Sequence, residues 1–518
     1  MKRLISILLC FVLICSFAGC SEAYDPQAYV PTGDALEGEH VADDAALAEK
    51  DEQQEQTLAL AYYPDRSMNP LEATDFTNRA LMSLLYQGLF AVNENYEVIP
   101  LLCKSYTVSS DMMTYEFTLD PKATFSDGTP VKAEDVVTSL LASMQTDYYS
   151  GRLRHVDLIA ATATDKVQII LSQAYENLPL LLDIPIVKEK QILDPYPLGT
   201  GPYVIGRTTS GVFLSRRSNW WCSSDDLLIA ANRIDLIKAD STNTIRDAFE
   251  FGEVGVVCTD PGSDRYVEYR CDYELWNCET GIFVYLGVNR DSYLFQDRSL
   301  RQALSKGIDR RYLVDQFYQG FATAAELPAS PNSPFYSETL AQKYAYDADA
   351  YQKAMSAVKG FTVRLLVNQS DSFRVRVAQE ISRMLSTSGL IVEVVSVSSG
   401  DYRVLLAQGE YDLYLGQTKL SPNMNLTPFF SSGGELNYGD IDDVGIYTLC
   451  LQALENQGNY YNLHKAVMDE GYLCPVLFRS YAVYAARGLV TSLNPARDNL
   501  FCYSIGRTME DAFTIEAY

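Results

Sequence analysis

The sequence predicts a mixed α/β protein, and three observations support this fold class. Residues 361–367 (FTVRLLV) and 391–397 (IVEVVSV) have the alternating side chains that are typical of half-buried strands. Between them, residues 373–385 have apolar side chains at the spacing of an amphipathic helix. This order predicts a strand–helix–strand unit with parallel strands. The length of 518 residues allows two or three domain-sized cores.

The first elements of the structured chain are expected after residue 56. Residues 57–63 (TLALAYY) form a strand-like run that Pro64 closes. Residues 77–88 have apolar side chains at helical spacing, and the terminal Gly88 suits the left-handed position after a helix. Residues 114–119 (TYEFTL) alternate as a half-buried strand does.

A turn and a helix are expected next. Residues 126–130 (SDGTP) have turn chemistry, and residues 133–144 follow as a helix. Glu134 and Asp135 place acidic groups in its first turn, where the helix dipole favours them.

Four strands and one helix are predicted in the rest of the chain. The strands are 203–205, 212–215, 282–288 and 411–415, and the helix is 297–307.

The N-terminus predicts export from the cytoplasm. A short basic start is followed by the apolar residues 4–17, a length typical of a signal peptide and too short to span a bilayer comfortably. Phe17-Ala18-Gly19-Cys20 resembles a bacterial lipobox, in which the cysteine receives diacylglycerol and becomes the mature N-terminus. Residues 1–20 are therefore expected to be a lipoprotein signal peptide with Cys20 lipidated; the alternative is an ordinary cleaved signal.

Residues 21–56 contain eleven Asp and Glu, a single Lys and few large apolar side chains. Such a segment buries too little apolar surface to offset its chain entropy. It is expected to be an acidic, disordered tether between the anchor and the folded protein.

The formal net charge of −26 limits the possible partners. Phosphate backbones are bound by basic surfaces, so nucleic acid is not expected to be a partner. An acidic surface is also repelled by anionic lipid headgroups. Attachment to a membrane is therefore expected through the lipid and not through charge.

The cysteines show no metal-binding or redox pattern. Of the eleven, Cys10 and Cys15 belong to the signal peptide and Cys20 would carry lipid. The other eight have no CxxC pair and no spacing typical of metal ligands. Cys271 and Cys278 are close in sequence, but disulfide pairing is left open.

Several segments, taken in order, resemble a family of extracellular solute-binding proteins that includes oligopeptide-, dipeptide- and nickel-binding members. The most specific match lies within residues 115–136, where YEFTL is followed by ATFSDGTPVKAEDV. Weaker matches occur at 68–71 (MNPL), 85–89 (LYQGL), 199–203 (GTGPY), 295–304 (FQDRSLRQAL) and 307–310 (GIDR).

This resemblance implies a two-lobed fold like that of periplasmic binding proteins, with an additional inserted domain and a ligand cleft at the hinge. The implied domains are lobe I (57–88, 200–283 and 485–518), the inserted domain (89–199) and lobe II (284–484).

The resemblance also implies ligand-binding residues in two segments. The first is Thr74, Asp75 and Phe76, and the second is Gln417, Thr418, Lys419 and Ser421. In peptide-binding members an Asp holds the ligand's α-amino group, and the alignment places Ser421 there. No acid occurs between Asp412 and Glu435. Either another acid such as Asp75 replaces the anchor, or the ligand is not a peptide with a free amine.

Catalytic patterns are not found in the sequence. The chain has three His, and it lacks HExxH, GxSxG, Walker A and dinucleotide-binding motifs. No catalytic residue, metal or cofactor is expected. Trp220 and Trp221 are interpreted as packing residues, with stacking on a ligand as the alternative.

The resemblance predicts a non-enzymatic, monomeric substrate-binding lipoprotein of an ABC importer on the outer face of the cytoplasmic membrane or in the periplasm. It would capture a peptide or peptide-like ligand and deliver it to permease and ATPase subunits. Two alternatives stay open: a member that binds a nickel chelate, haem or glycan, and a receptor lipoprotein without a transport role.

Overall fold

The computed structural model describes residues 58–512, except 210, 223–230, 491–492 and 504–508. The expected signal peptide, the tether and Cys20 lie outside the described residues. Within the described ranges, none of the helices has the length and apolar character needed to span a membrane.

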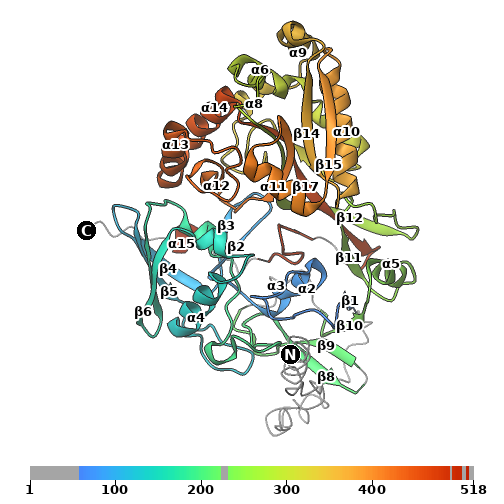
Figure 1. The fold of residues 1–518 in the computed structure, drawn as a ribbon. Helices are drawn as coiled ribbons and strands as arrows, with labels where there is room; N and C mark the ends of the chain where they lie inside the picture. The colour runs from blue at the N-terminus through green and yellow to red at the C-terminus, as the bar shows by residue number, and fades with distance from the viewer. Residues whose placement is uncertain (1–57, 210, 223–230, 491–492, 504–508, 513–518) are drawn as a thin grey trace, which may run out of the picture. The chain divides into compact units, whose positions relative to one another are not determined.

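A mixed sheet of eleven strands runs through the fold (Figure 1). Ten strands follow one another across it, and the eleventh pairs with β17. In spatial order they are β15 (Ile391–Val397), β14 (Thr362–Asn368), β16 (Leu413–Lys419), β12 (Tyr273–Val288), β17 (Leu473–Ala486), β11 (Val256–Thr259), β1 (Leu58–Tyr62), β10 (Arg233–Lys238), β9 (Gly211–Arg216) and β8 (Tyr203–Thr208), with β13 (Ala322–Ala324) beside β17. Every strand predicted in these regions overlaps one of them, and the α/β fold class is confirmed.

The strands β12 and β17 are the longest of the sheet and pair with each other along nearly their whole length. Their register shifts between Glu279 and Ile282, where Gly281 has a φ of +73°. A side chain is costly in that left-handed conformation, so glycine suits this bulge.

The side chains of this strand pair change cores at the bulge. Cys278 and Val483 belong to a hydrophobic core that also includes β1 and β5, whereas Phe283 and Phe478 pack in a second core with residues of β16 and α13. One pair of strands therefore contributes to both of these cores, and other side chains of the same strands, such as Val284 and Ala482, belong to two further cores.

The predicted strand–helix–strand unit is confirmed. The strands β14 and β15 are parallel, and α10 (Ser372–Ser386) packs against both (Figure 1). Asp371 caps the helix by accepting a hydrogen bond from the Arg374 backbone N–H at 2.9 Å. Because the apolar face of α10 must be buried, its periodicity was sufficient to predict this arrangement.

The other helices of residues 298–470 surround this part of the sheet. The expected helix 297–307 is α6, continued by a 3₁₀ turn at Ser305–Gly307. The α-helices are α6 (Arg298–Leu304), α7 (Arg310–Gln316), α8 (Glu338–Ala341), α9 (Ala348–Met355), α11 (Ser399–Gln408), α12 (Thr427–Phe430), α13 (Val444–Glu455) and α14 (Tyr460–Glu470).

Residues 90–171 form two smaller antiparallel sheets. The first is β2 (Phe90–Val92) with β3 (Val98–Pro100), and the second has the order β4 (Cys103–Val108), β5 (Thr114–Leu119), β7 (Lys166–Leu171), β6 (Val156–Ala163). The helix α4 (Ala133–Ser143) packs against this second sheet. Outside these sheets lie α2 (Phe76–Ala80), α3 (Met82–Leu85), α5 (Thr242–Glu250) and α15 (Met509–Ala512).

The most specific sequence motif has a structural role. Asp127 accepts hydrogen bonds from the Thr129 N–H at 3.0 Å and its hydroxyl at 2.6 Å, and Gly128 has a φ of +78°. Asp135 accepts from the Lys132 N–H at 2.9 Å and the Glu189 N–H at 2.8 Å. These contacts form the turn, begin α4 and tie it to a distant loop.

One predicted helix is wrong in its extent. Residues 77–88 contain the short helices α2 and α3, and the chain becomes extended at Tyr86. Gly88 does not have a left-handed φ; a Cβ there would lie 2.8 Å from the Phe90 carbonyl oxygen and 2.9 Å from that of Ile184. Glycine is therefore required for close backbone packing and not for ending a helix.

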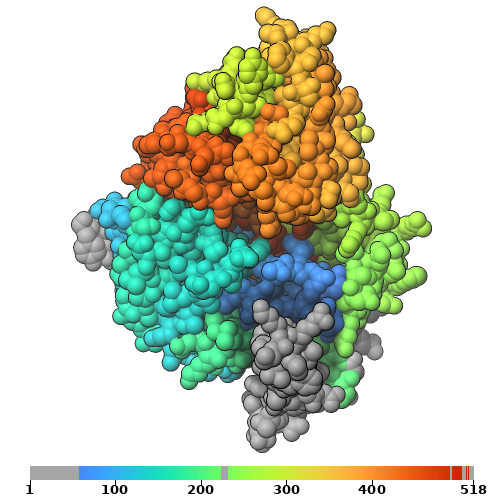
Figure 2. Space-filling model, viewed as in Figure 1, coloured from blue at the N-terminus to red at the C-terminus, as the bar shows by residue number. Residues whose placement is uncertain are grey.

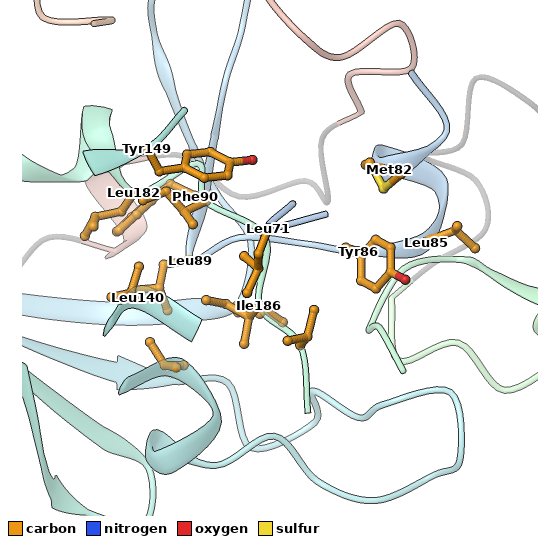
Figure 3. Close-up of a cluster of buried hydrophobic side chains, with 14 of the residues drawn as sticks. Leu71, Met82, Leu85, Tyr86, Leu89, Phe90, Leu140, Tyr149, Leu182 and Ile186 are labelled. Carbon is orange, nitrogen blue, oxygen red and sulfur yellow. The ribbon is translucent and has the colours of Figure 1, made fainter. Parts of the chain in front are cut away.

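This packing belongs to a large apolar cluster (Figure 3). Leu89, Phe90, Leu140 of α4 and Ile186 belong to this cluster, and all four side chains are almost completely buried. Burial of one such side chain contributes about 1.5–3 kcal/mol. The cluster fixes residues 71–90 against the second sheet.

Free thiols of the described chain include Cys258, Cys271, Cys278, Cys450, Cys474 and Cys502. Cys271 and Cys278, whose pairing the sequence left open, do not form a disulfide with each other.

Candidate ligand cavity

A cavity of about 540 Å³ is lined by three separated segments of the chain. Residues 147–154 come from the predicted inserted domain, residues 418–436 from predicted lobe II, and Arg497 from the C-terminal part of predicted lobe I. The lining residues are Asp147, Tyr148, Ser150, Gly151, Arg152, Arg154, Thr418, Lys419, Leu420, Ser421, Asn425, Pro428, Glu435, Leu436 and Arg497.

The two longer segments meet at one side of the cavity. Arg154 forms an ion pair with Glu435 at 3.0 Å. In Figure 2 the teal surface of the chain around residue 150 touches the orange surface around residue 430. Because both side chains are partly exposed, this pair contributes at most about 1 kcal/mol to stability.

The lobe II segment leaves the sheet at the end of β16. The Leu420 N–H donates to the Gly281 carbonyl at 3.0 Å, which places this segment directly beside the bulge of β12. The Ser421 hydroxyl donates to the Asn423 side-chain oxygen at 2.5 Å. Thus Ser421 offers a neutral polar group to the cavity.

A cluster of charged side chains lies against the same cavity, in which Arg152 is buried and Lys419 and Asp498 are partly buried. Lys419 Nζ donates to an Asp498 oxygen at 2.5 Å and to the Tyr148 hydroxyl at 2.7 Å. Arg152 pairs with Asp183 and lies 3.7 Å from Asp498.

Burial and charge have opposite effects on these groups. Burial lowers the pKa of Lys419 to about 8, although Asp498 opposes this change. Burial alone would raise the pKa of Asp498, but Lys419, Arg79 and Arg152 together hold it well below its usual range. Asp498 is therefore ionised and paired with its cationic neighbours.

Arg497 completes the cluster from the C-terminal part of the chain. Its guanidinium is buried, and Nη2 donates to the Leu420 carbonyl at 2.9 Å. Its backbone N–H donates to the Glu279 carbonyl at 2.9 Å. Arg497 thus contacts both the cavity and the bulge of β12.

Of the seven residues predicted to bind ligand, three line this cavity: Thr418, Lys419 and Ser421. Gln417 does not; its side-chain oxygen accepts a hydrogen bond from Arg479 at 2.9 Å.

The residues Thr74, Asp75 and Phe76 do not line the cavity either. Asp75 caps α2 by accepting from the Thr77 N–H at 2.9 Å, and it pairs with Arg66. The ring of Phe76 packs edge-on against Tyr481 at 4.8 Å. These contacts give Asp75 and Phe76 local structural roles.

The two neighbouring tryptophans have packing contacts, as interpreted. Trp220 Nε1 donates to the Thr200 carbonyl at 3.0 Å, and its ring packs on Tyr503. Trp221 Nε1 donates to Gln87 at 2.9 Å.

Sequence reasoning missed the cationic lining residues Arg152, Arg154 and Arg497, as well as Tyr148. None of them lies in a recognisable motif. The only available signal was the run Arg152-Leu153-Arg154, which places two cations close together in an acidic chain.

Comparison with known proteins identifies the family of the chain. The model of the bacterial extracellular solute-binding proteins, family 5 (middle region), matches residues 97–437, which is more than half of the chain. The chain belongs to this family. It is a family 5 solute-binding protein, and this family is made up of binding proteins rather than enzymes.

Curated relatives of this solute-binding protein include glutathione-binding proteins GsiB. The protein from Pectobacterium atrosepticum is 26% identical over 352 residues, covering 64% of this chain and 68% of the relative. The protein from Salmonella paratyphi A is 25% identical over 390 residues, covering 72% and 74%.

Solved structures share the two-lobed fold of the family. The ABC transporter substrate-binding protein CtaP from Listeria monocytogenes matches with a TM-score of 0.70 and 18% identity, over 86% of this chain and 97% of CtaP. A peptide-binding protein AppA from Clostridium difficile matches with a TM-score of 0.67 and 16% identity, over 86% and 98%. These matches confirm the predicted fold class.

Proposed function

We propose that this solute-binding protein captures a peptide or peptide-like ligand in the cavity and delivers it to the permease and ATPase subunits of an ABC importer. The observation that carries the proposal is the 540 Å³ cavity, which three distant segments of one chain line with polar and charged side chains. Ligand sites for small molecules typically have volumes of about 300–1,000 Å³. The glutathione-binding relatives and the AppA structure support the choice of a peptide-like ligand.

The proposal includes closure of two lobes about a hinge. Lobe I would comprise 57–88, 200–283 and 485–518, lobe II 284–484, and the inserted domain 89–199. The bulge at Gly281 supports a hinge in β12, because the strand pair changes cores there. Leu420 and Arg497 both bond to this bulge, so a ligand held beside them would favour one arrangement of the hinge.

Free-amine peptides are expected to bind weakly. Ser421 carries no charge, and the acids in the lining, Asp147 and Glu435, are both exposed. An ammonium group buried without a partner costs several kcal/mol, and about 1.4 kcal/mol changes affinity tenfold. The contacts of Asp75 with α2 and Arg66 support a role in the fold rather than as a replacement anchor.

Calorimetry with matched peptides tests this function. The wild type should bind N-acetylated tripeptides more tightly than the same peptides with a free amine, and Ser421→Asp should reverse the order. Asp75→Asn serves as the second variant and should leave the preference unchanged. Tight binding of free-amine peptides that Asp75→Asn abolishes would assign the anchor to Asp75. If neither peptide set binds, the peptide function is wrong.

A further inference from the structure

A single residue after β7 joins the region of the small sheets to the helices α13 and α14. The Glu176 backbone N–H donates to the Leu454 carbonyl at 3.0 Å. A carboxylate oxygen of Glu176 accepts a hydrogen bond from the Gln457 N–H at 2.8 Å. Leu454 lies near the end of α13, and Gln457 begins the short 3₁₀ turn that leads into α14. Glu176 and Gln457 are 281 positions apart, so these bonds join distant segments of the chain.

Apolar side chains cross the same junction in both directions. Leu454 of α13 is 2% exposed and belongs to the core that includes residues of β4, β5 and β7. Leu180, which follows Glu176 closely, is completely buried in the core that contains Ile446 of α13 and Leu463 of α14. Each segment thus places one leucine in the core of the other, and separating the segments would expose both leucines to water.

The same two regions of the chain also meet at the cavity. The Tyr148 hydroxyl accepts a hydrogen bond from Lys419, and Arg154 pairs with Glu435. All four of these residues line the cavity, whereas the residues of the junction after β7 are not part of its described lining. The junction is therefore able to influence access to the cavity without touching a ligand.

The polar and apolar parts of the junction have different roles. The Glu176 side chain is exposed, so water competes for its hydrogen bond with the Gln457 N–H, and this bond is broken at low cost. Burial of the two leucines needs no ligand and favours contact between the segments at all times. The leucines therefore draw the segments together, and the directional hydrogen bonds fix their position.

We propose that Glu176, Leu180, Leu454 and Gln457 form a clasp that holds the cavity closed and sets how long a ligand stays bound. The inference rests on the proposed function, in which two lobes close over a peptide-like ligand. In the proposed domain division the clasp joins the inserted domain to lobe II. The hinge at the bulge of β12 allows movement, and the clasp decides how often the cavity opens. Because its leucines are buried without a ligand, the unliganded protein favours the closed arrangement.

Stopped-flow dissociation of N-acetylated tripeptides measures the lifetime of the complex. Glu176→Ala removes the acceptor of the exposed hydrogen bond. Gln457→Pro removes its donor at the first position of a 3₁₀ turn, where proline is tolerated. Each change should raise the dissociation rate about two- to tenfold, as expected for the loss of one hydrogen bond.

Two comparisons make the rate measurement specific. Glu176→Ala combined with Gln457→Pro should add little to either change alone, because both remove the same bond. The control Glu134→Gln alters an exposed acid of α4, and its complex should dissociate like that of the wild type. Wild-type dissociation rates in both clasp variants would overturn the inference.

Small-angle X-ray scattering tests the clasp without any ligand, at a temperature below the Tm of every variant. Glu176→Ala/Leu454→Ala should have a larger radius of gyration than the wild type, because open molecules accumulate. The matched control is Glu134→Gln/Leu463→Ala, since Leu463 is as well buried as Leu454 but lies in the same core as the rest of α14. Both pairs lose a buried leucine and some stability, so expansion confined to the first pair supports the clasp. Equal radii of the two pairs would overturn it.

The two measurements separate failure of the clasp from failure of the proposed function. If no tripeptide binds, peptide capture is wrong, and the scattering result alone decides whether the clasp exists. If tripeptides bind and neither the dissociation rate nor the radius of gyration responds to the clasp variants, the clasp is wrong and peptide capture stands.

Discussion

Lys419 is positioned to make ligand binding depend on pH. Burial lowers its pKa to about 8, and an anionic ligand beside it would raise that pKa. The affinity that its charge contributes is therefore complete below pH 8 and is lost as the pH rises above 8. Titration calorimetry with an N-acetylated tripeptide acid from pH 7 to 9.5 should show an affinity that is constant below pH 8 and falls as the pH rises above 8. A tenfold fall would correspond to about 1.4 kcal/mol of binding free energy.

Lys419→Arg is the matched control for this dependence. The guanidinium stays charged throughout the range, so the fall in affinity should disappear. A similar fall in Lys419→Arg would assign the titration to another group.

At the level of single residues, the family resemblance located part of the cavity lining. Thr418, Lys419 and Ser421 were predicted by aligning the segment after residues 411–415 with a ligand-binding segment of the family, and all three line the cavity. Arg497 was not predicted, because it lies in an irregular segment and has a left-handed backbone conformation. Its burial depends on Gly281, which is 216 residues earlier, and no local pattern indicates such a contact.

The helix α14 contains a buried histidine that should make the protein acid-sensitive. His464 is completely buried, both ring nitrogens lack a hydrogen-bond partner in the described chain, and burial lowers its pKa to about 3. The unfolded chain takes up a proton near pH 6.5, so stability is lost as the pH falls from 6.5 toward 3. Each pKa unit corresponds to about 1.4 kcal/mol, which gives a loss of several kcal/mol.

Urea unfolding at pH 7 and pH 4.5 measures this effect. His464→Phe keeps a ring beside Tyr460 without a titrating group, and the difference in unfolding free energy between the two pH values should shrink. An unchanged difference would show that other groups cause the acid sensitivity.

The bulge of β12 should tolerate no side chain. Gly281→Ala would adopt an unfavourable φ and would also place Cβ against Arg497. We expect a loss of about 1–3 kcal/mol in unfolding free energy, together with weaker ligand binding. Gly360→Ala is the control: Gly360 has a φ of +84°, but a Cβ there would meet no atom within 4 Å. Equal effects of the two changes would show that only the backbone conformation matters.

At the level of elements, the spacing of apolar side chains correctly predicted helices and strands that bury one face in a core. The strands β14 and β15 with α10 between them follow directly from their side-chain pattern. Residues 77–88 have an equally good helical pattern, but the Tyr86 hydroxyl donates to the distant Pro197 carbonyl at 3.0 Å and Gly88 packs against Leu182 and Ile184. These contacts with residues about 100 positions away end the helix early, and they cannot be predicted from the local sequence pattern.

For the whole protein, attachment to the membrane is expected to depend on one residue outside the described part of the chain. Cys20→Ala should release the protein from the membrane fraction, because its net charge of −26 does not favour anionic lipids and a single signal peptide is removed. Intact mass measurement of the mature protein should show a lipid on its first residue. Membrane association that persists in Cys20→Ala would contradict the lipid anchor.

The sequence could not show how the predicted lobes are joined. The boundaries 283/284 and 484/485 came from the resemblance, and both fall within strands, β12 and β17, that continue on either side of them. Alternation along a strand looks the same on both sides of such a boundary. Only the pairing of the two strands reveals where the cores change.

This continuous pair of strands has a consequence for how the protein melts. Neither core can come apart without breaking the backbone ladder that also completes the other core. The regions should therefore lose their structure together, as one cooperative transition in calorimetry, despite their separate interiors. A fragment cut at the predicted boundaries would lack part of each shared strand, and it should not fold as an autonomous piece. Mechanical coupling between the cores and their joint folding are thus properties of the same two strands.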